Sequence, residues 1–96
     1  MALVLQLVPG EDFYVGGERY VLKEIVSDTA FTIERARDGK RFHILDDKAI
    51  LIEADVYASA GTRGQATSAR LCIEAPRSVR ILRGELYRQA QSQISR

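Results

Sequence analysis

The 96-residue chain has no tryptophan, one cysteine, one histidine and two prolines, and its net charge at neutral pH is only +1. The single cysteine, Cys72, excludes an internal disulfide framework, and its position in an apolar run predicts a small buried side chain. No apolar stretch reaches the ~18 residues that a membrane-spanning helix requires. The apolar residues 2–8 are too short for a signal peptide and follow no basic segment. We therefore expect a cytoplasmic protein without membrane contact.

Groups that could carry catalysis are also sparse. His43 is the only histidine, and a pair with Cys72 would join two residues that both lie in apolar segments. Acid–base or nucleophilic catalysis needs convergent groups with tuned pKa values, which this pattern does not supply. Asp38, Asp46 and Asp47 lack the ligand spacing of zinc or calcium sites, and neighbouring strand residues point to opposite faces. The sequence predicts a protein that is not an enzyme and has no cofactor, metal site or small-molecule substrate.

The composition is that of one ordinary globular domain, with 46% hydrophobic and 28% charged residues. The charges are unevenly distributed along it. Residues 1–76 carry nine basic and twelve acidic side chains, whereas residues 77–96 carry five arginines and one glutamate. Arginine binds phosphates and base edges well, but a basic segment is also compatible with an ordinary solvated surface. Charge alone leaves both interpretations open.

Alternation with a period of two dominates the chain and predicts strands, separated by Gly-Gly, Asp-Gly and Ala-Pro turn signals. In the segment 20–26, Tyr20, Leu22 and Val26 are predicted to share one face. The segment 49–58 is predicted to be one continuous strand. The full set of predicted strands is 2–8, 13–15, 20–26, 30–35, 41–45, 49–58, 69–74 and 78–83.

The C-terminal residues follow a different period. Leu86, Ala90 and Ile94 recur every four residues and predict a short amphipathic helix over 85–94. Residues 59–67 are small and polar and include two glycines, which predicts a loop. The sequence therefore predicts a mostly β fold, a small antiparallel sheet or barrel-like domain that ends in a short helix.

The segment from Ala69 to Tyr87, ARLCIEAPRSVRILRGELY, resembles the C-terminal part of the carbon storage regulator family of translational repressors. That family carries a strand ending in an Ala-Pro corner, a second strand with alternating valines, an arginine, an acidic residue and an aromatic helix start. The residues here that fall on this pattern are Ala75, Pro76, Val79, Ile81, Arg83, Glu85 and Tyr87. The resemblance covers about half of the chain, because the family's first strand and hairpin are similar to Leu3-Val4-Leu5, Pro9-Gly10-Glu11 and Val15-Gly16.

The resemblance implies an intertwined homodimer in which the first strand of one subunit lies beside the last strand of the other. It also implies two sites that bind GGA triplets in single-stranded loops of messenger or small RNA, with repression of translation where the triplet overlaps a ribosome-binding site. Arg83 is expected to bond a guanine or a phosphate, while Arg77 and Arg80 attract phosphates and aliphatic neighbours contact base faces. The complete set of expected RNA-binding residues is Arg83, Leu82, Arg80, Val79, Ile81, Arg77 and Leu5.

Two departures from the family leave a second interpretation open. The single domain, residues 1–96, is longer than typical members, and we expect residues 18–67 to insert extra strands. Leu7 and Val8 stand where the family has basic residues that contact RNA. The basic side chains that could replace them surround one Asp-Gly turn and are Arg35, Arg37, Lys40 and Arg41. The alternative is a protein-binding accessory or antagonist module that keeps the scaffold and has lost RNA binding.

Overall fold

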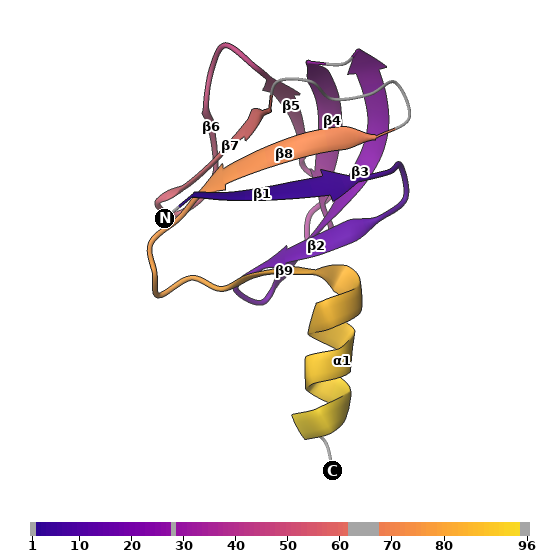
Figure 1. Cartoon of the computed structure of the whole chain (residues 1–96), viewed down its shortest axis with the longest axis vertical. Helices are drawn as coiled ribbons and strands as arrows, with labels where there is room; N and C mark the ends of the chain where they lie inside the picture. Colours follow the sequence, from indigo (N-terminus) through magenta and orange to yellow (C-terminus); the bar gives the residue numbers. More distant parts are fainter. Residues whose placement is uncertain (1, 28, 62–67, 95–96) are drawn as a thin grey trace.

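Two antiparallel β-sheets pack against each other in the computed structural model, which describes residues 2–27, 29–61 and 68–94 (Figure 1). A helix follows the last strand. The elements are β1 (Ala2–Leu7), β2 (Asp12–Val15), β3 (Glu18–Ser27), β4 (Ala30–Arg35), β5 (Arg41–Leu45), β6 (Ile50–Glu53), β7 (Val56–Ala60), β8 (Ala69–Glu74), β9 (Ile81–Arg83) and α1 (Gly84–Ile94). The predicted mostly β class with a short C-terminal helix is confirmed.

The chain passes from one sheet to the other three times. The four-stranded sheet has the strand order β1-β8-β7-β6, and the five-stranded sheet has the order β5-β4-β3-β2-β9. All neighbouring strands are antiparallel. Strands β1 and β9 are therefore edge strands of different sheets, and among the described residues each has a strand neighbour on one side only.

A polar link inside the apolar core joins the two sheets. The hydroxyl of the fully buried Tyr20 donates to the carbonyl of Ile52 at 2.9 Å and to the carboxylate of Glu53 at 2.7 Å. Arg35 donates to the same two acceptors, each at 3.1 Å. Burial and the adjacent carboxylate raise the pKa of Tyr20, which keeps its hydroxyl protonated as a donor. These bonds hold β3 and β4 against the end of β6.

Strand β3 keeps the predicted faces only in its first half. Tyr20 and Leu22 are buried, as the alternation predicts. The register with β4 then shifts at Lys23, which forms a bulge. The extra residue inverts the alternation, so that Ile25 packs against the core and Val26 is exposed. The prediction that Val26 shares the face of Tyr20 is therefore wrong.

The predicted strand 49–58 is a hairpin formed by β6 and β7. Ala54 and Asp55 make its turn, and Asp55 has a φ of 62°, a left-handed conformation that aspartate adopts more readily than most residues. The predicted loop 59–67 starts later than expected, because β7 continues through Ala60. The greater part of that loop lies outside the described residues.

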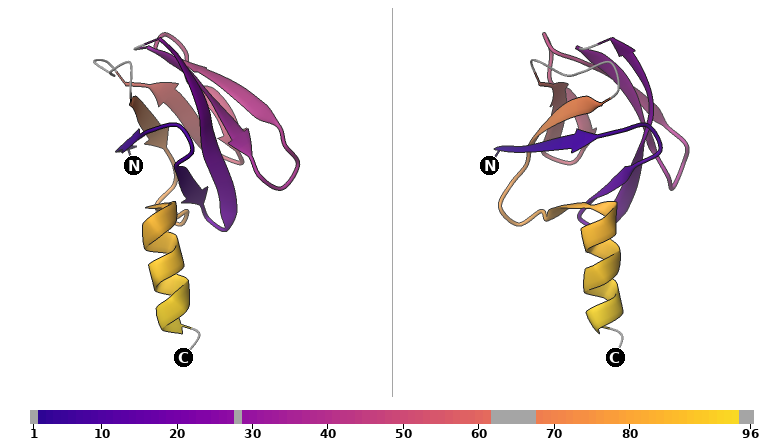
Figure 2. Two further views of the ribbon diagram at one scale, coloured as in Figure 1. Left: turned by 90° about the vertical axis from the view of Figure 1, so that its right-hand side faces the viewer. Right: turned by 45° about the vertical axis from the view of Figure 1, so that its right-hand side comes forward.

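Helix α1 confirms the predicted C-terminal helix and begins one residue earlier, at Gly84. Leu86 of the predicted apolar stripe is 49% exposed and does not pack on the sheets. Tyr87 makes that contact instead, since its ring stacks on the ring of Tyr14 with a centroid separation of 3.7 Å. The helix projects away from both sheets (Figure 2). In the described part of the chain no helix is long and apolar enough to cross a membrane.

Candidate nucleic-acid interface

Two cavities each have lining residues from both β1 and β9, and we refer to them together as the β1–β9 groove. The first, the apolar pocket, has a volume of about 270 Å³ and is open to solvent. Its lining residues are Leu3, Ala75, Arg77, Val79, Arg80 and Ile81. It therefore combines aliphatic walls with two guanidinium groups.

 

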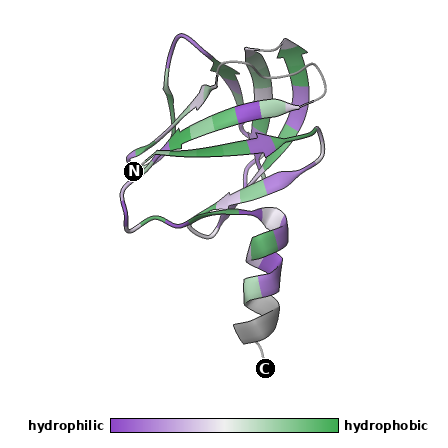
Figure 3. Ribbon diagram, viewed as in Figure 1, coloured by the Kyte–Doolittle hydropathy of each residue, from purple (hydrophilic) through white to green (hydrophobic). Residues whose placement is uncertain are grey.

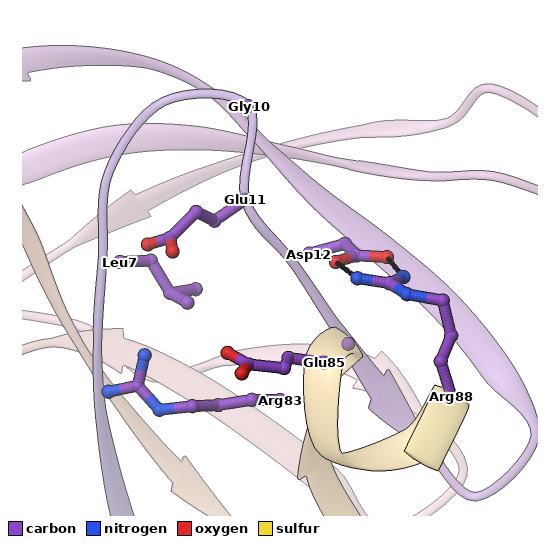
Figure 4. A pocket seen from close by; sticks show the side chains of 8 residues that line it. Leu7, Gly10, Glu11, Asp12, Arg83, Glu85 and Arg88 are labelled. Carbon is purple, nitrogen blue, oxygen red and sulfur yellow. Dashed lines mark hydrogen bonds and ion pairs between the residues drawn. The ribbon is translucent and has the colours of Figure 1, made fainter.

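The two cavities are of similar size, about 270 Å³ for the apolar pocket and about 370 Å³ for its neighbour. The neighbour, which we call the charged pocket, lies at the start of α1 (Figure 4). Its lining residues are Leu7, Gly10, Glu11, Asp12, Arg83, Gly84, Glu85 and Arg88. The β1–β9 groove thus has an apolar end and a mixed-charge end.

The corner between β8 and β9 shapes the apolar pocket. The N–H of Val79 donates to the carbonyl of Pro76 at 3.0 Å and closes a turn. The carbonyl of Arg80 then accepts from the N–H of Gly16 at 2.8 Å, which leads the chain into β9. The predicted strand 78–83 is therefore shorter than expected and begins at Ile81, because the turn occupies its first half.

Three of the four arginines that line the groove have no acidic partner among the described residues. Within the residues that the structure describes, the guanidinium groups of Arg77, Arg80 and Arg83 form no ion pair and no hydrogen bond. By contrast, Arg88 of the charged pocket pairs with Asp12. The arginines outside the groove that pair with carboxylates are Arg19, Arg35, Arg37 and Arg41. The three groove arginines are accordingly available to an anion from outside the chain.

Arg83 enters the charged pocket from β9. It stands opposite the buried Phe13 in the antiparallel register, so that its side chain leaves the strand on the inner face. Figure 4 shows Arg83 below Leu7, with the carboxylates of Glu11 and Glu85 directed into the same space. Glu11 also accepts a hydrogen bond from the N–H of Val8 at 2.8 Å, which orients its carboxylate.

Asp12 fixes the position of the helix beside the charged pocket. Its carboxylate is 8% exposed and accepts from Arg19 Nε and Arg88 Nη1, both at 2.8 Å. Burial alone would raise the pKa of Asp12, but the hydrogen bonds from Arg88 and Arg19 outweigh it and lower the pKa. A Cβ at Gly84 would overlap this carboxylate, which explains why the helix begins with glycine. Arg88 is thus committed to Asp12, unlike Arg83.

The structure brings most of the expected RNA-binding residues to the groove, but not all. Arg77, Val79, Arg80 and Ile81 line the apolar pocket and Arg83 lines the charged pocket. The other two lie elsewhere. The side chain of Leu5 is buried in the core, and Leu82 stands opposite Tyr14 on the outer face of the five-stranded sheet. Their expected side-chain contacts with RNA in this groove are not supported by these positions.

Sequence reasoning missed the acidic groups of the charged pocket. Glu11 follows β1 and Glu85 lies in the first turn of α1, so they meet because β1 and β9 border one groove. Glu85 belongs to the family pattern, but its proximity to Glu11 depends on the packing of the two sheets. No local signal in the sequence indicates this meeting.

The basic residues around the Asp38-Gly39 turn have partners within the chain. Arg35 bonds Asp38 at 2.8 Å, and this contact lowers the pKa of Asp38 to about 2. Arg37 pairs with Glu18, and the ammonium of Lys40 lies over the ring of Phe42. Arg41 is similarly held by a carboxylate of β4. The charges of this turn are therefore largely balanced within the chain.

No family model, curated protein or solved structure gives a significant match to this chain. Among the described residues, no group of three or more histidine, cysteine, aspartate and glutamate side chains is placed to hold a metal ion.

Proposed function

We propose that this chain is a cytoplasmic RNA-binding regulator that holds single-stranded RNA in the β1–β9 groove and represses translation of the bound message. The observation that carries the proposal is a set of three unpaired arginines in one groove. Arg77 and Arg80 line its apolar pocket, and Arg83 lines its charged pocket. Unpaired bases bind to proteins through their faces and edges, while arginines attract the phosphates between them. The groove offers both kinds of contact within a few residues.

The free edges of β1 and β9 support the same proposal. In the described structure each strand leaves one row of backbone N–H and C=O groups without a neighbouring strand. Such groups can bond the edges of unstacked bases, which is how single-stranded RNA is commonly read. Leu3 and Ile81 would contact the base faces from the two sides of the apolar pocket.

The distribution of charge favours one orientation of the RNA. Arg77 and Arg80 lie at the apolar end, where no carboxylate lines the pocket, and would attract phosphates. Glu11 and Glu85 would repel phosphates at the other end but can accept hydrogen bonds from base amino groups. With Arg83 as a donor beside them, this end suits a base better than a phosphate. That arrangement agrees with the GGA preference that the family resemblance implies.

Fluorescence anisotropy with a labelled RNA stem-loop tests the proposal. The loop contains GGA in one RNA and a scrambled triplet in the other, and binding is measured at two salt concentrations. Arg80→Ala and Arg83→Ala should each weaken binding by on the order of 1–3 kcal/mol, and Arg80→Ala should also reduce the salt dependence. The matched control is Arg41→Ala, which removes the same charge from β5, away from the groove. Absence of binding, or equal effects of all three variants, contradicts the proposal.

A protein-binding module is the second candidate, and one observation favours it. The groove is bordered by two strand edges, so an extended peptide could pair with the backbone of β1 or β9. Leu7 in the charged pocket, where the resembling family has a basic residue, fits a peptide better than RNA. A pull-down that returns a specific protein and no nucleic acid would favour this candidate, whereas co-purified RNA would count against it.

A further inference from the structure

Two tyrosine rings are stacked on the surface where α1 leaves the five-stranded sheet, and we refer to them as the tyrosine pair. Tyr14 of β2 and Tyr87 of α1 lie with their centroids 3.7 Å apart and an interplanar angle of 9°. Both side chains are partly exposed, unlike the stacked rings of Phe13 and Tyr20, which are fully buried. Core packing explains the buried stack, whereas the partly exposed tyrosine pair also presents ring surface to solvent.

Aliphatic and cationic side chains border the tyrosine pair. Tyr14 stands between Leu82 on β9 and Arg19 on β3 in the antiparallel registers, on the outer face of the sheet. Leu82 is also partly exposed. Figure 3 shows a hydrophobic band between hydrophilic segments in the first turns of α1. Apolar and polar surfaces therefore alternate around the two rings.

The charge beside the tyrosine pair is positive, because two arginines share one carboxylate. Arg19 bonds Asp12 through Nε and Arg88 bonds it through Nη1, both at 2.8 Å. The side chain of Asp12 is 8% exposed, whereas those of Arg19 and Arg88 are 46% and 59% exposed. In the part of the chain that the structure describes, the two terminal nitrogens of Arg19 have no partner. They can donate hydrogen bonds to an anion from outside the chain.

Arg88 connects the tyrosine pair to the β1–β9 groove. Asp12 and Arg88 both line the charged pocket (Figure 4). Asp12, and to a smaller extent Tyr14, raise the pKa of Arg88, so the guanidinium of Arg88 lies close to Tyr14 as well. The tyrosine pair is therefore continuous with the charged end of the groove.

We propose that the tyrosine pair is a base-stacking site for a nucleotide that flanks the RNA segment held in the groove. This inference rests on the proposed function. Bases of single-stranded RNA stack on aromatic rings largely without regard to sequence, because every base has a π-face. Arg19 and Arg88 would attract the phosphate of the same nucleotide. The RNA strand is the expected occupant because the surface is cationic and continues from the charged pocket.

An abasic scan tests the stacking site with the full chain and a short, labelled single-stranded RNA that contains GGA. Each nucleotide that flanks the triplet is replaced in turn by an abasic residue, and binding is measured by fluorescence anisotropy. Wild-type affinity should fall about tenfold at one flanking position, since the stacking of one base contributes on that order. Tyr87→Leu should bind the intact RNA about tenfold more weakly and should lose no further affinity at that position. Tyr87→Phe keeps the ring and should behave as the wild type.

Tyr57 provides the matched control, because its ring is exposed on the other sheet. Tyr57 is 45% exposed, and among the described residues no aromatic ring stacks on it. A neighbour on that face is Cys72, which is partly buried rather than fully buried as the sequence predicts. Tyr57→Leu should therefore bind the intact and the abasic RNAs as the wild type does.

The abasic comparison separates base stacking from a structural effect of the substitution. If Tyr87→Leu only displaced the helix, it would weaken the binding of intact and abasic RNAs by the same factor, and the tenfold loss at the flanking position would persist. That result would overturn the stacking site. Equal affinities of Tyr87→Leu and the wild type for the intact RNA would overturn it as well.

Photochemical cross-linking locates the stacked base. The RNA carries 5-iodouridine at the sensitive flanking position, and tryptic peptides are identified by mass spectrometry. The cross-link should fall in residues 84–88, which contain Tyr87, or in residues 1–19, which contain Tyr14. A cross-link confined to residues 49–63, which contain Tyr57, would contradict the proposed position.

Failure of the stacking site is distinguishable from failure of the proposed function. Wild-type binding that depends on Arg83 but shows no flanking position sensitive to Tyr87→Leu would overturn the stacking site alone. Absence of binding to every RNA in the series would overturn both.

Discussion

The contact between Gly84 and Asp12 makes Gly84→Ala an informative substitution. Helix propensity alone predicts stabilisation, because alanine is favoured over glycine by up to about 1 kcal/mol within a helix. The structure predicts the opposite. The new Cβ would overlap the carboxylate of Asp12, which is largely buried and holds both Arg19 and Arg88.

The expected loss comes mainly from the carboxylate. Displacement would leave a buried acceptor without its partners, which costs about 1–3 kcal/mol. Arg19 and Arg88 are about half-exposed and can be solvated after the contact breaks, so they add little. Since any gain in helix propensity is small in the first turn, the variant should lose about 1–3 kcal/mol of unfolding free energy. For a domain of this size, that corresponds to a fall in Tm of roughly 5–20 °C.

Urea unfolding followed by far-ultraviolet circular dichroism measures this loss. Gly17→Ala is the matched control, since no atom lies within 4 Å of its added Cβ, and it should be as stable as the wild type or slightly more. In an Asp12→Ala background the carboxylate is absent, so adding Gly84→Ala should cost nothing further. Equal stability of the two glycine variants, or a penalty that persists without Asp12, would refute the reasoning.

Three further predictions concern stability. Hydrogen bonding from Arg35 lowers the pKa of Asp38 to about 2, so the ionised carboxylate stabilises the folded state above pH ~4, and this stabilisation is lost as the pH falls towards 2. In Asp38→Asn the urea unfolding midpoint should therefore change less with pH over that range. Burial raises the pKa of Tyr20, so its protonated hydroxyl stabilises the folded state below pH ~10, and this stabilisation is lost at higher pH. In Tyr20→Phe the urea unfolding midpoint should therefore fall less between pH 9 and 12. Tyr87→Ala should cost on the order of 1 kcal/mol in urea unfolding, because its ring is stacked, whereas Leu86→Ala should cost less because that side chain is half-exposed. A larger loss for Leu86→Ala would contradict the observed packing of the helix.

Local pattern in the sequence predicted the strands well where the alternation is uninterrupted. The faces of Tyr20 and Leu22 followed from it, and so did the existence of the final helix. The bulge at Lys23 was not predictable in this way, because nothing about that residue marks it as extra; the shift appears only in its pairing with β4. The turn at Asp55 was missed for a similar reason, since Ala-Asp is a weak turn signal between two β-prone segments.

The candidate site was predictable only in part. Residues close in sequence, such as Arg77, Arg80 and Ile81, could be grouped from the family resemblance alone. Which strand borders them depends on how the two sheets are arranged. The position of Glu11 beside Arg83 depends on the same arrangement. Leu82 shows the limit of the resemblance, because the side on which it leaves β9 is set by its register with Tyr14.

Among the described residues, five arginines pair with carboxylates, and three arginines of the groove do not. Those paired with carboxylates, such as Arg35 and Arg88, orient elements of the fold, and their charges are already balanced. The three unpaired arginines of the groove have no such structural task in the described residues, so removing one should change binding more than stability. If Arg80→Ala lowers the salt-dependent affinity for RNA and leaves the unfolding free energy unchanged, the groove binds a polyanion. If these arginines were only an ordinary solvated surface at the C-terminal end of the chain, Arg80→Ala would change neither the RNA affinity nor the unfolding free energy.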